Sequence, residues 1–445
     1  MAFMHSPQPN LGISAEPASP ARTKFFLNDG SPRNVRVWMA IILGIGLAVR
    51  MTLILVNSHS AQYGGEPYNI ALSLANHGTY ADVFGSGSGP TAHISPALPI
   101  ILALIIRVAG TGPAGHLVNS TLAAIVAATA FALLPALAVK CRLGMLPGVT
   151  AGLVGAAAPI NYWAQTAGYW DAPYAMLGLT GLCVLFSGYW IRQFFPIRAG
   201  IFLGVLSGVV CLVNPTILQV LVGWCIVGMV RFKKNRIAFL RVMATVAVII
   251  VIILSPWAFR NFKTLGGAIW TRSNFGLELQ LSNRDGATAD LERNVRSPDF
   301  PHPLTQRKER QKVRQMGELA YHQAKKKEAL LWIRNHPVRF TQLVVLRIFF
   351  FWFPPMLRWW QSIAEALMTI LAIAGLISLF KKNHPSAWMF LAVLTFYPAV
   401  YLVVQVSPRY RLPIEPILLL LGSFFCLDLW NTLGRNWLKV PSEQL

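Results

Sequence analysis

The sequence predicts an all-α polytopic membrane protein, and three observations lead to that prediction. Of the 445 residues, 54% are hydrophobic and only 13% are charged, whereas about 25% of the residues of an ordinary soluble domain are charged. The mean hydropathy is +0.50. Apolar runs near the roughly 20 residues that cross a bilayer recur along the whole chain, and helices satisfy their backbone hydrogen bonds within such a segment.

Ten of the apolar runs have a length that suits a transmembrane helix. They lie at 37–56, 116–138, 145–160, 173–191, 199–214, 216–231, 238–256, 362–380, 386–405 and 414–430. Two shorter runs, at 96–109 and 343–356, are as often interfacial or re-entrant as spanning. If 96–109 does not span, the cations of every short loop fall on the side of the N-terminus, as the positive-inside bias requires. We therefore expect ten spans with both chain ends in the cytoplasm.

This topology divides the chain into five parts. They are a disordered cytoplasmic tail at 1–36, an N-terminal transmembrane catalytic module at 37–256 with a first outer loop at 57–115, a basic outer loop with amphipathic helices at 257–361, C-terminal transmembrane helices at 362–430 and a cytoplasmic tail at 431–445. The helix-forming middle of the basic loop, 304–336, has two interpretations: it lies on anionic headgroups, or it is a solvated helix over the site.

The net charge of +22 is typical of the positive-inside bias combined with contacts to anionic headgroups or phosphates, and we do not expect nucleic-acid binding. The five cysteines lie in or beside apolar runs without a CxxC pair, which argues against a disulfide framework and a zinc site. Four histidines of the first outer loop, His59, His77, His93 and His116, show no metal-ligand spacing. We interpret them as polar loop residues.

Glu66 is the first candidate for chemistry. Residues 57–95 contain no Lys or Arg, and Glu66 and Asp82 are their only acids. Gly64–Gly65 predicts a turn, and an amphipathic run follows, so we expect Glu66 at a helix start on the membrane face. One interpretation is an acid that stabilises the helix dipole by a few tenths of a kcal/mol; the other is a catalytic carboxylate.

Asp171 favours the catalytic interpretation. It lies in PINYWAQTAGYWDAPYAML among aromatic residues, which are ordinary at a membrane interface, whereas an acid is not. The topology brings Glu66 and Asp171 to the same face, where one would deprotonate an acceptor hydroxyl and the other would orient it or the donor. A partly desolvated carboxylate whose pKa is raised towards neutrality would suit the base.

Two further segments carry candidate ligands for a phosphate or a sugar. The first ends the span near residue 256, and the second precedes the last span, where arginines run against the positive-inside trend. Guanidinium groups donate two parallel hydrogen bonds to phosphate, although Arg260 also fits a snorkelling arginine. The candidates are Arg260, Asn261, Arg272, Asn274, Arg409, Tyr410 and Arg411. Arg50, inside the first span, must pair or reach the outer interface.

Together these elements resemble the bacterial membrane glycosyltransferases of the GT-C superfamily, which include protein mannosyltransferases and lipid A aminoarabinose transferases. The resemblance rests on YGGEPYNIALSLANHGTY, GPTAHISPALPIILAL, SPWAFRNFKTLGGAIWTRSNFGLELQLSN, NHPVRFTQLVVLRIFFFW and SPRYRLPIEPILLLL, in order over about residues 37 to 430. It implies a GT-C-like bundle of about ten transmembrane helices with two long outer loops that contain interfacial helices.

The resemblance also implies a function. Such enzymes transfer a sugar from a polyprenyl-phosphate carrier to a cell-envelope acceptor (a glycolipid, polysaccharide or protein) on the periplasmic or outer face of the bacterial inner membrane, usually with inversion. Glu66 maps to the catalytic position and Asp171 to the acid of the second outer loop, while Tyr68, His93 and Tyr169 are candidate acceptor or donor contacts. No cofactor is required, and a divalent metal, which some relatives use, is not indicated here.

Two other interpretations remain open. A lipid-linked sugar flippase or transporter would also have many spans and polar outer loops, but such proteins typically carry ionisable residues near the midplane and an internal repeat, and neither is clear in this sequence. A non-catalytic assembly or sensor subunit would leave Glu66 and Asp171 without a shared task.

Overall fold

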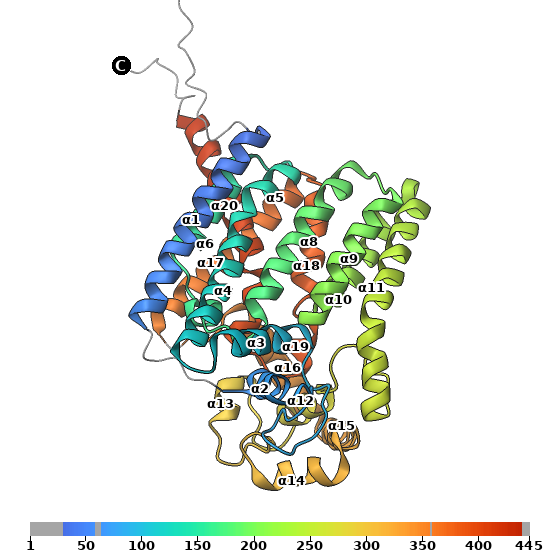
Figure 1. Ribbon diagram of the computed structural model, residues 1–445. Coiled ribbons are helices and arrows are strands. Elements are labelled where there is room, and N and C mark those ends of the chain that lie inside the picture. Colours follow the sequence, from blue (N-terminus) through green and yellow to red (C-terminus); the bar gives the residue numbers. More distant parts are fainter. Residues whose placement is uncertain (1–29, 58–63, 357, 438–445) are drawn as a thin grey trace, which may run out of the picture.

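The computed structural model describes residues 30–57, 64–356 and 358–437, and these residues form helices, with no strand beyond two isolated bridges (Figure 1). The α-helices are α1 (Pro32–Val56), α2 (Glu66–His77), α3 (Ala97–Ala109), α4 (Pro113–Ala132), α5 (Leu134–Lys140), α6 (Met145–Ala157), α7 (Tyr162–Thr166), α8 (Ala172–Arg192), α9 (Ile197–Val213), α10 (Ile217–Arg231), α11 (Arg236–Leu265), α12 (Phe275–Ser282), α13 (Leu291–Val295), α14 (Arg307–Met316), α15 (Glu318–Asn335), α16 (Pro337–Trp352), α17 (Trp359–Lys381), α18 (Ser386–Phe396), α19 (Ala399–Val403) and α20 (Glu415–Trp437). Short 3-10 helices are η2 (Lys233–Asn235), η3 (Pro408–Tyr410) and η4 (Leu412–Ile414).

The predicted fold class is confirmed as an all-α membrane protein. Each of the ten predicted spans contains a helix of the bundle in Figure 1. Among the described residues, seven helical segments are long and apolar enough to cross a bilayer: Pro32–Val56, Pro113–Lys140, Ala172–Arg192, Lys233–Leu265, Trp359–Lys381, Ser386–Val403 and Pro408–Leu433. The predicted spans that form α6, α9 and α10 are shorter apolar helices, so the number ten stays a prediction.

Exposed apolar side chains on the outside of the bundle indicate contact with lipid. On α11, Val248 and Ile252 are 58% and 62% exposed, and on α3 Leu104 and Val108 are 57% and 89% exposed. Each pair is four residues apart and therefore lies along one stripe of its helix. Apolar surface of this kind marks a membrane or protein contact, and its occurrence on α11, which is of spanning length, favours the membrane.

The helix ends differ from the predicted tails. α1 begins at Pro32, inside the predicted tail 1–36, because Ser31 accepts a hydrogen bond from the Asn34 amide (3.4 Å) and a proline suits the first turn. α20 continues to Trp437, beyond the predicted boundary at 431. The rest of the predicted tails, 1–29 and 438–445, lies outside the described residues.

The two predicted outer loops form one cap at the lower end of the bundle in Figure 1. The short apolar run 96–109 is α3, which lies with α2 across this end, and the run 343–356 forms most of α16. The cap has its own hydrophobic core, to which both loops contribute: Ile70, Tyr80, Val83, Phe84, Leu277, Leu281, Phe300, Val313 and Tyr321. This shared core places residues from distant parts of the sequence next to one another.

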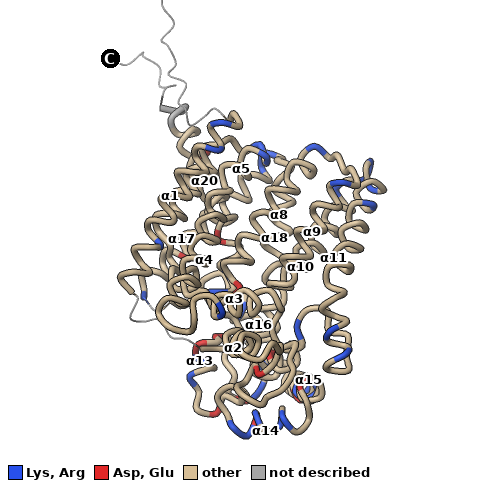
Figure 2. Tube along the Cα trace, viewed as in Figure 1, with Lys and Arg blue, Asp and Glu red and all other residues tan. Residues whose placement is uncertain are grey.

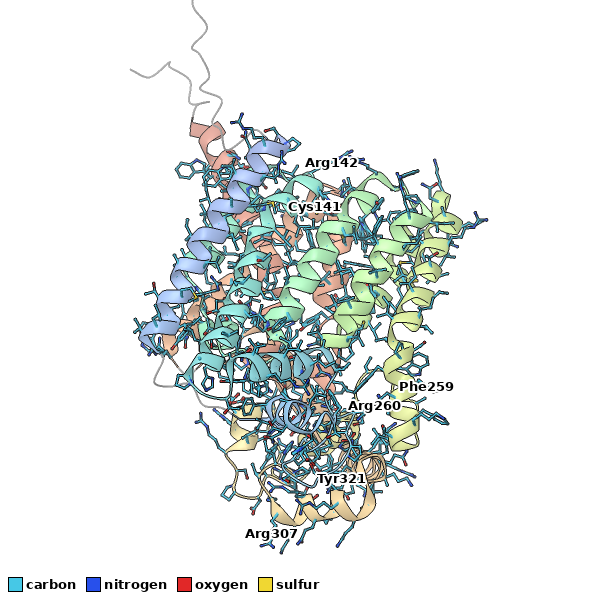
Figure 3. All side chains as sticks on the ribbon, viewed as in Figure 1. Cys141, Arg142, Phe259, Arg260, Arg307 and Tyr321 are labelled. Carbon is cyan, nitrogen blue, oxygen red and sulfur yellow. The ribbon has the colours of Figure 1, made fainter. Side chains whose placement is uncertain are left out.

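Charge is distributed as the topology predicts. Figure 2 shows Lys and Arg at the upper end of the bundle, opposite the cap, and a second group on the cap around α14 and α15. The start of α1 and the end of α20 lie at the upper end, and Figure 3 places Arg142 there as well. The cations of the short loops therefore share one end with the described chain ends.

Candidate functional site

Glu66 is the first residue of α2, as the sequence predicts. Gly65, which precedes it, has φ 103° and ψ 169°, a conformation that is essentially restricted to glycine. The turn at Gly64–Gly65 directs the chain into a helix that packs along α3. Glu66 thus begins the helix that Figure 1 shows beside α3 at the lower end of the bundle.

Two imidazole rings contact the Glu66 carboxylate. Glu66 Oε1 lies 3.1 Å from His93 Nε2 and 3.1 Å from His302 Nε2, both ion-pair distances. The His93 side chain is fully buried, while that of Glu66 is 17% exposed. His93 is a predicted contact residue; His302 comes from the second outer loop, where no sequence pattern marks it as a site residue.

The ring of His302 is oriented by its neighbours. Its Nδ1 accepts a hydrogen bond from the Leu304 amide (3.1 Å), which in the neutral ring places the proton on Nε2, facing Glu66. Phe300 stacks on the ring at a centroid distance of 5.7 Å, and the edge of Phe84 meets it at 5.8 Å. Phe84 also lies 5.0 Å from the ring of His93, so one aromatic residue separates the two imidazoles.

The pKa of the Glu66 carboxyl is lowered rather than raised. Burial alone would raise its pKa, but the charge of His93 and the contacts of both imidazoles hold the pKa of Glu66 well below its usual range. Burial would lower the pKa of His93, yet the negative Glu66 raises it. Glu66 therefore lacks the raised pKa that would suit a base, because the contributions of the two imidazoles together outweigh desolvation.

A third histidine extends this group. The ring of His322, on α15, lies 5.2 Å from the ring of His93. Burial and the charge of His93 hold the pKa of His322 well below its usual value, so His322 is the neutral neighbour of a charged pair.

Glu318, the first residue of α15, positions the loop that carries His93. It accepts hydrogen bonds from the Thr91 hydroxyl, the Ala92 amide (2.8 Å) and the Ser273 hydroxyl (2.6 Å). Thr91 Oγ in turn accepts from the His93 amide at 2.9 Å. A buried carboxylate that accepts three donors fixes a loop more firmly than neutral hydrogen bonds would.

Arg260 supports the same loop from the lower end of α11, where Figure 3 labels it. Its guanidinium donates to the carbonyl oxygens of Thr91 (2.6 Å) and Tyr80 (2.7 Å), and it lies 5.2 Å from the ring centroid of Trp257. Asn261 is fully buried and donates to the Ile269 carbonyl (2.7 Å). These contacts brace the cap; binding of a phosphate by Arg260 stays a prediction.

Asp171 forms a second group with Arg272. The two side chains are paired, and Asn214 donates to the same Asp171 oxygen at 3.2 Å. Burial would lower the pKa of Arg272, but Asp171 raises it. Arg272 also donates to the Ser95 hydroxyl (3.0 Å), two residues beyond His93. The predicted pair of carboxylates therefore belongs to two adjacent groups, each with its own cationic partner.

Tyrosines lie between the two groups. Tyr68, two residues after Glu66, meets Tyr169 edge to face at a centroid distance of 6.2 Å, and the Tyr169 hydroxyl bonds to His116. These contacts show that the segments carrying Glu66 and Asp171 lie side by side, as the predicted topology requires.

The two arginines of the last predicted segment, Arg409 and Arg411, lie in different surroundings. The Arg409 guanidinium lies 3.5 Å from the ring centroid of Trp170, next to Asp171, and donates to the Tyr410 hydroxyl at 3.3 Å. Arg411 is 1% exposed and pairs with Glu365 of α17 at 3.2 Å. Asn274, the remaining candidate, is half-buried immediately before α12.

A buried polar cluster lies inside the bundle, and only its arginines could be singled out from the sequence. Asn161 donates to Glu365 (3.1 Å) and Glu415 (3.3 Å), which brings two buried carboxylates to one amide. Arg50 donates to Gln165 (3.1 Å). Arg50 is six residues before the end of α1, about 9 Å from that end. The sequence signal for this cluster was Arg50 itself, because a charge inside a span must be paired.

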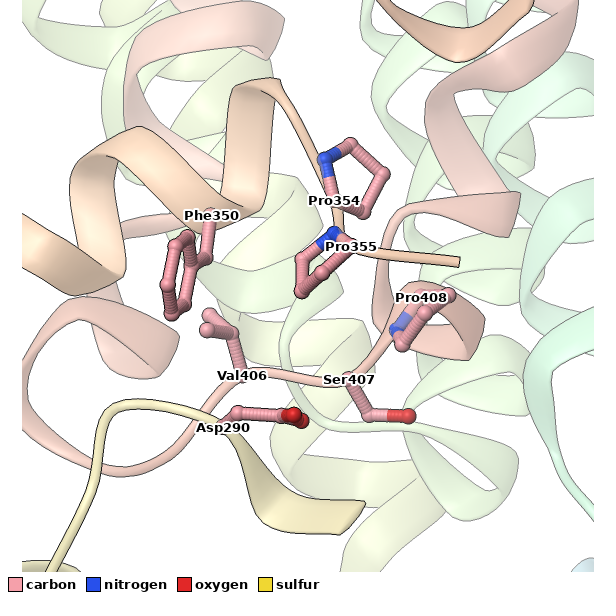
Figure 4. A pocket seen from close by; sticks show the side chains of 7 residues that line it. All are labelled: Asp290, Phe350, Pro354, Pro355, Val406, Ser407 and Pro408. Atoms are coloured by element: carbon pink, nitrogen blue, oxygen red, sulfur yellow. The ribbon is translucent and has the colours of Figure 1, made fainter. Parts of the chain in front are cut away.

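A small hollow lies between α13, the end of α16 and the segment before η3. It measures about 170 Å³ with the space open to solvent, and Figure 4 shows Asp290 and Ser407 below Phe350, Pro354 and Pro355. Burial raises the pKa of Asp290, whose carboxylate accepts from the Glu292 amide (3.1 Å) at the start of α13. These contacts identify Asp290 as a helix cap.

Among the described residues, no group of three or more His, Cys, Asp or Glu side chains is arranged to hold a metal ion; His59 lies outside them. Neither a family model nor a curated protein matches the chain.

Proposed function

We propose that this protein is a glycosyltransferase that moves a sugar from a polyprenyl-phosphate carrier to a cell-envelope acceptor on the outer face of the bacterial inner membrane, with inversion. The observation that carries the proposal is the ionised Glu66, held by two imidazoles where the cap meets the bundle. A lipid-linked donor and a polar acceptor meet at this level of a membrane protein. The resemblance of the surrounding motifs to GT-C enzymes supplies the reaction type.

The geometry leaves one Glu66 oxygen for the acceptor. Both imidazole contacts use Oε1, and the side chain retains exposed area. In the proposed step, the acceptor hydroxyl oxygen attacks the anomeric carbon while its proton passes to Glu66 Oε2. The bond from that carbon to the phosphate oxygen breaks, and its electron pair leaves with the lipid phosphate.

Arg409 is the best placed of the predicted phosphate ligands. Arg411 is committed to Glu365 and Arg260 to backbone carbonyls, whereas Arg409 lies beside Asp171 and Arg272 and bonds only to Tyr410 among the described residues. A guanidinium next to an aromatic surface suits a phosphate whose prenyl chain continues into lipid.

The test follows sugar release from a polyprenyl-phosphate donor by purified protein in nanodiscs. We expect Glu66→Gln to lower turnover by about a hundredfold or more, since general bases contribute about 10²–10⁴, and Asp171→Asn to lower it less. Glu328→Gln, an exposed acid on α15, is the matched control. Turnover that survives both site substitutions would sink the catalytic assignment.

A lipid-linked sugar flippase is the second candidate, and the buried cluster of Arg50, Glu365, Arg411 and Glu415 favours it, because such residues often line transport pathways. Arg411 and Glu415 lie at the start of the last spanning segment, Pro408–Leu433, rather than at its middle, which weakens that case. Passage of intact lipid-linked sugar between leaflets without sugar release would establish the flippase.

The proposed orientation has ten spans, both chain ends in the cytoplasm and the cap outside. Reporter fusions after residues 112 and 142 test it, since Gly112 precedes α4 and Arg142 follows α5. We expect an outer signal at 112 and a cytoplasmic signal at 142. A cytoplasmic signal at 112 would overturn the ten-span topology.

A further inference from the structure

The cap carries a strong excess of positive charge that the proposed reaction does not use. Residues 257–361 contain 18 Lys and Arg but only 8 Asp and Glu. The densest part is α14, RKERQKVRQM. Figure 3 places Arg307 at the extreme lower edge of the cap, at the end opposite Arg142.

One face of α14 is packed and the other is exposed. Val313 and Glu309 are buried, and Glu309 accepts from the Tyr321 hydroxyl (2.6 Å) and pairs with Lys325 (3.1 Å). The acid of this helix is thus turned inward and neutralised. Among the described residues, its partner on the exposed side of the helix is Lys312 (2.6 Å).

The exposed face combines cations with amides. At about 100° per residue, Arg307, Gln311 and Arg314 follow one stripe opposite the buried Glu309, and Lys308 and Gln315 lie along one side of it; all five are exposed. Arg314 donates to the Ser86 carbonyl, whereas among the described residues Arg307 and Lys308 form no ion pair and no side-chain hydrogen bond that would occupy their charges. The stripe runs about 10 Å along the helix.

We propose that this face of α14 binds an acidic polysaccharide, a polymer whose carboxylate or phosphate groups pair with the cations and whose hydroxyls bond to the glutamines. Several cations along a line suit a repeating polyanion, which gains from releasing its counterions on binding. The proposal concerns the cap alone and holds whether or not the protein transfers a sugar.

Anionic lipid is the competing ligand, and the contacts of α14 disfavour it. A helix that lies on a membrane buries an apolar face in the lipid, whereas the exposed residues from Arg307 to Gln315 are all polar. Exposed apolar residues occur instead on α15 and α16, where Leu331 and Val338 are 60% and 71% exposed. The cap thus offers lipid a different surface.

Binding of fluorescent carboxymethyl-dextran to the full chain in zwitterionic nanodiscs tests the proposal, with uncharged dextran as the chemical control. We expect that only the charged polymer binds and that high salt weakens this binding. The double charge reversal Arg307→Glu with Lys308→Glu should weaken binding about tenfold. Each exposed charge pair contributes a factor of about 1.5 to 5 to the affinity, and the reversed charges add repulsion. Lys233→Glu with Lys234→Glu, exposed at the opposite end, should leave it unchanged.

Four outcomes would overturn the proposal: equal binding of dextran, no effect of the α14 reversal, an equal effect of the control reversal, or binding to anionic vesicles that depends on Arg307 and Lys308 but is not displaced by carboxymethyl-dextran. The last outcome would assign the face to lipid headgroups. The milder pair Arg307→Gln with Lys308→Gln should weaken binding about threefold and serves if the reversal disturbs folding of the cap.

Discussion

Removal of the Glu318 carboxylate should release the loop that carries His93. In Glu318→Ala, the Ala92 amide, which cannot turn to another acceptor, loses its 2.8 Å bond, and the hydroxyls of Thr91 and Ser273 lose theirs. Hydrogen bonds to a charged group contribute about 1.5–3 kcal/mol each, and a buried amide left unsatisfied costs about 1–3 kcal/mol. Because hydroxyls can rotate, we expect a total of about 3–4 kcal/mol.

Glu318→Gln should cost less. Its amide oxygen can still accept from Ala92 and Ser273, and only the Thr91 hydroxyl must reverse its role. Loss of the charge on the acceptor reduces each remaining bond to that of a neutral pair, so we expect about 1–2 kcal/mol.

Hydrogen exchange of the full chain in nanodiscs measures this local opening directly. At about 1.4 kcal/mol per tenfold, the amides of Ala92 and His93 should exchange about a hundredfold or more faster in Glu318→Ala and about tenfold faster in Glu318→Gln. Glu328→Ala is the control, because this acid of the same helix has a side chain that is 54% exposed. Exchange in Glu318→Ala as slow as in the control would refute the assigned role.

Two further predictions follow from the charged groups. The pKa of Glu66 is depressed below its usual 4.5 and that of His93 is raised above its usual 6.5. Their pair therefore contributes stability that is lost as pH falls through the Glu66 pKa or rises through the His93 pKa. Sugar release should be flat between those two usual values, and His93→Gln should remove the alkaline decline in a pH–rate profile. An acid limb near neutrality in the wild type would exclude Glu66 as the base. Arg411→Leu leaves Glu365 buried and without its cation, which should lower the free energy of unfolding by about 3–5 kcal/mol. Thermal unfolding should show this loss, and adding Glu365→Leu should restore more than half of it. An unchanged unfolding midpoint in Arg411→Leu would show that the pair does not stabilise the fold.

The helices of the bundle could be predicted because their signal is local. Each predicted span is an apolar run that lipid forces into a helix, and every such run contains one in the structure. The start of α2 was equally local, since Gly64–Gly65 and Glu66 mark it together. The boundary at Pro32 was missed because hydropathy rises later than the Ser31 cap.

The partners of the site residues could not be predicted from local pattern. His302 lies between two prolines in the second outer loop, and nothing in that stretch indicates that it meets Glu66 from the first. Their contact depends on the shared core of the cap, in which Phe84 of one loop packs with Phe300 of the other. Long-range packing of this kind leaves no periodic trace in the sequence.

The two carboxylates, Glu66 and Asp171, differ in whether their partner can change its protonation state. Arg272 stays protonated across the whole accessible pH range, so Asp171 always has a cationic partner. The partner of Glu66 is an imidazole, which can take up or release a proton near physiological pH. Glu66 can therefore exchange a proton with its surroundings while Asp171 holds its position, which argues for Glu66 as the base and for Asp171 as the residue that orients Arg272 toward the donor.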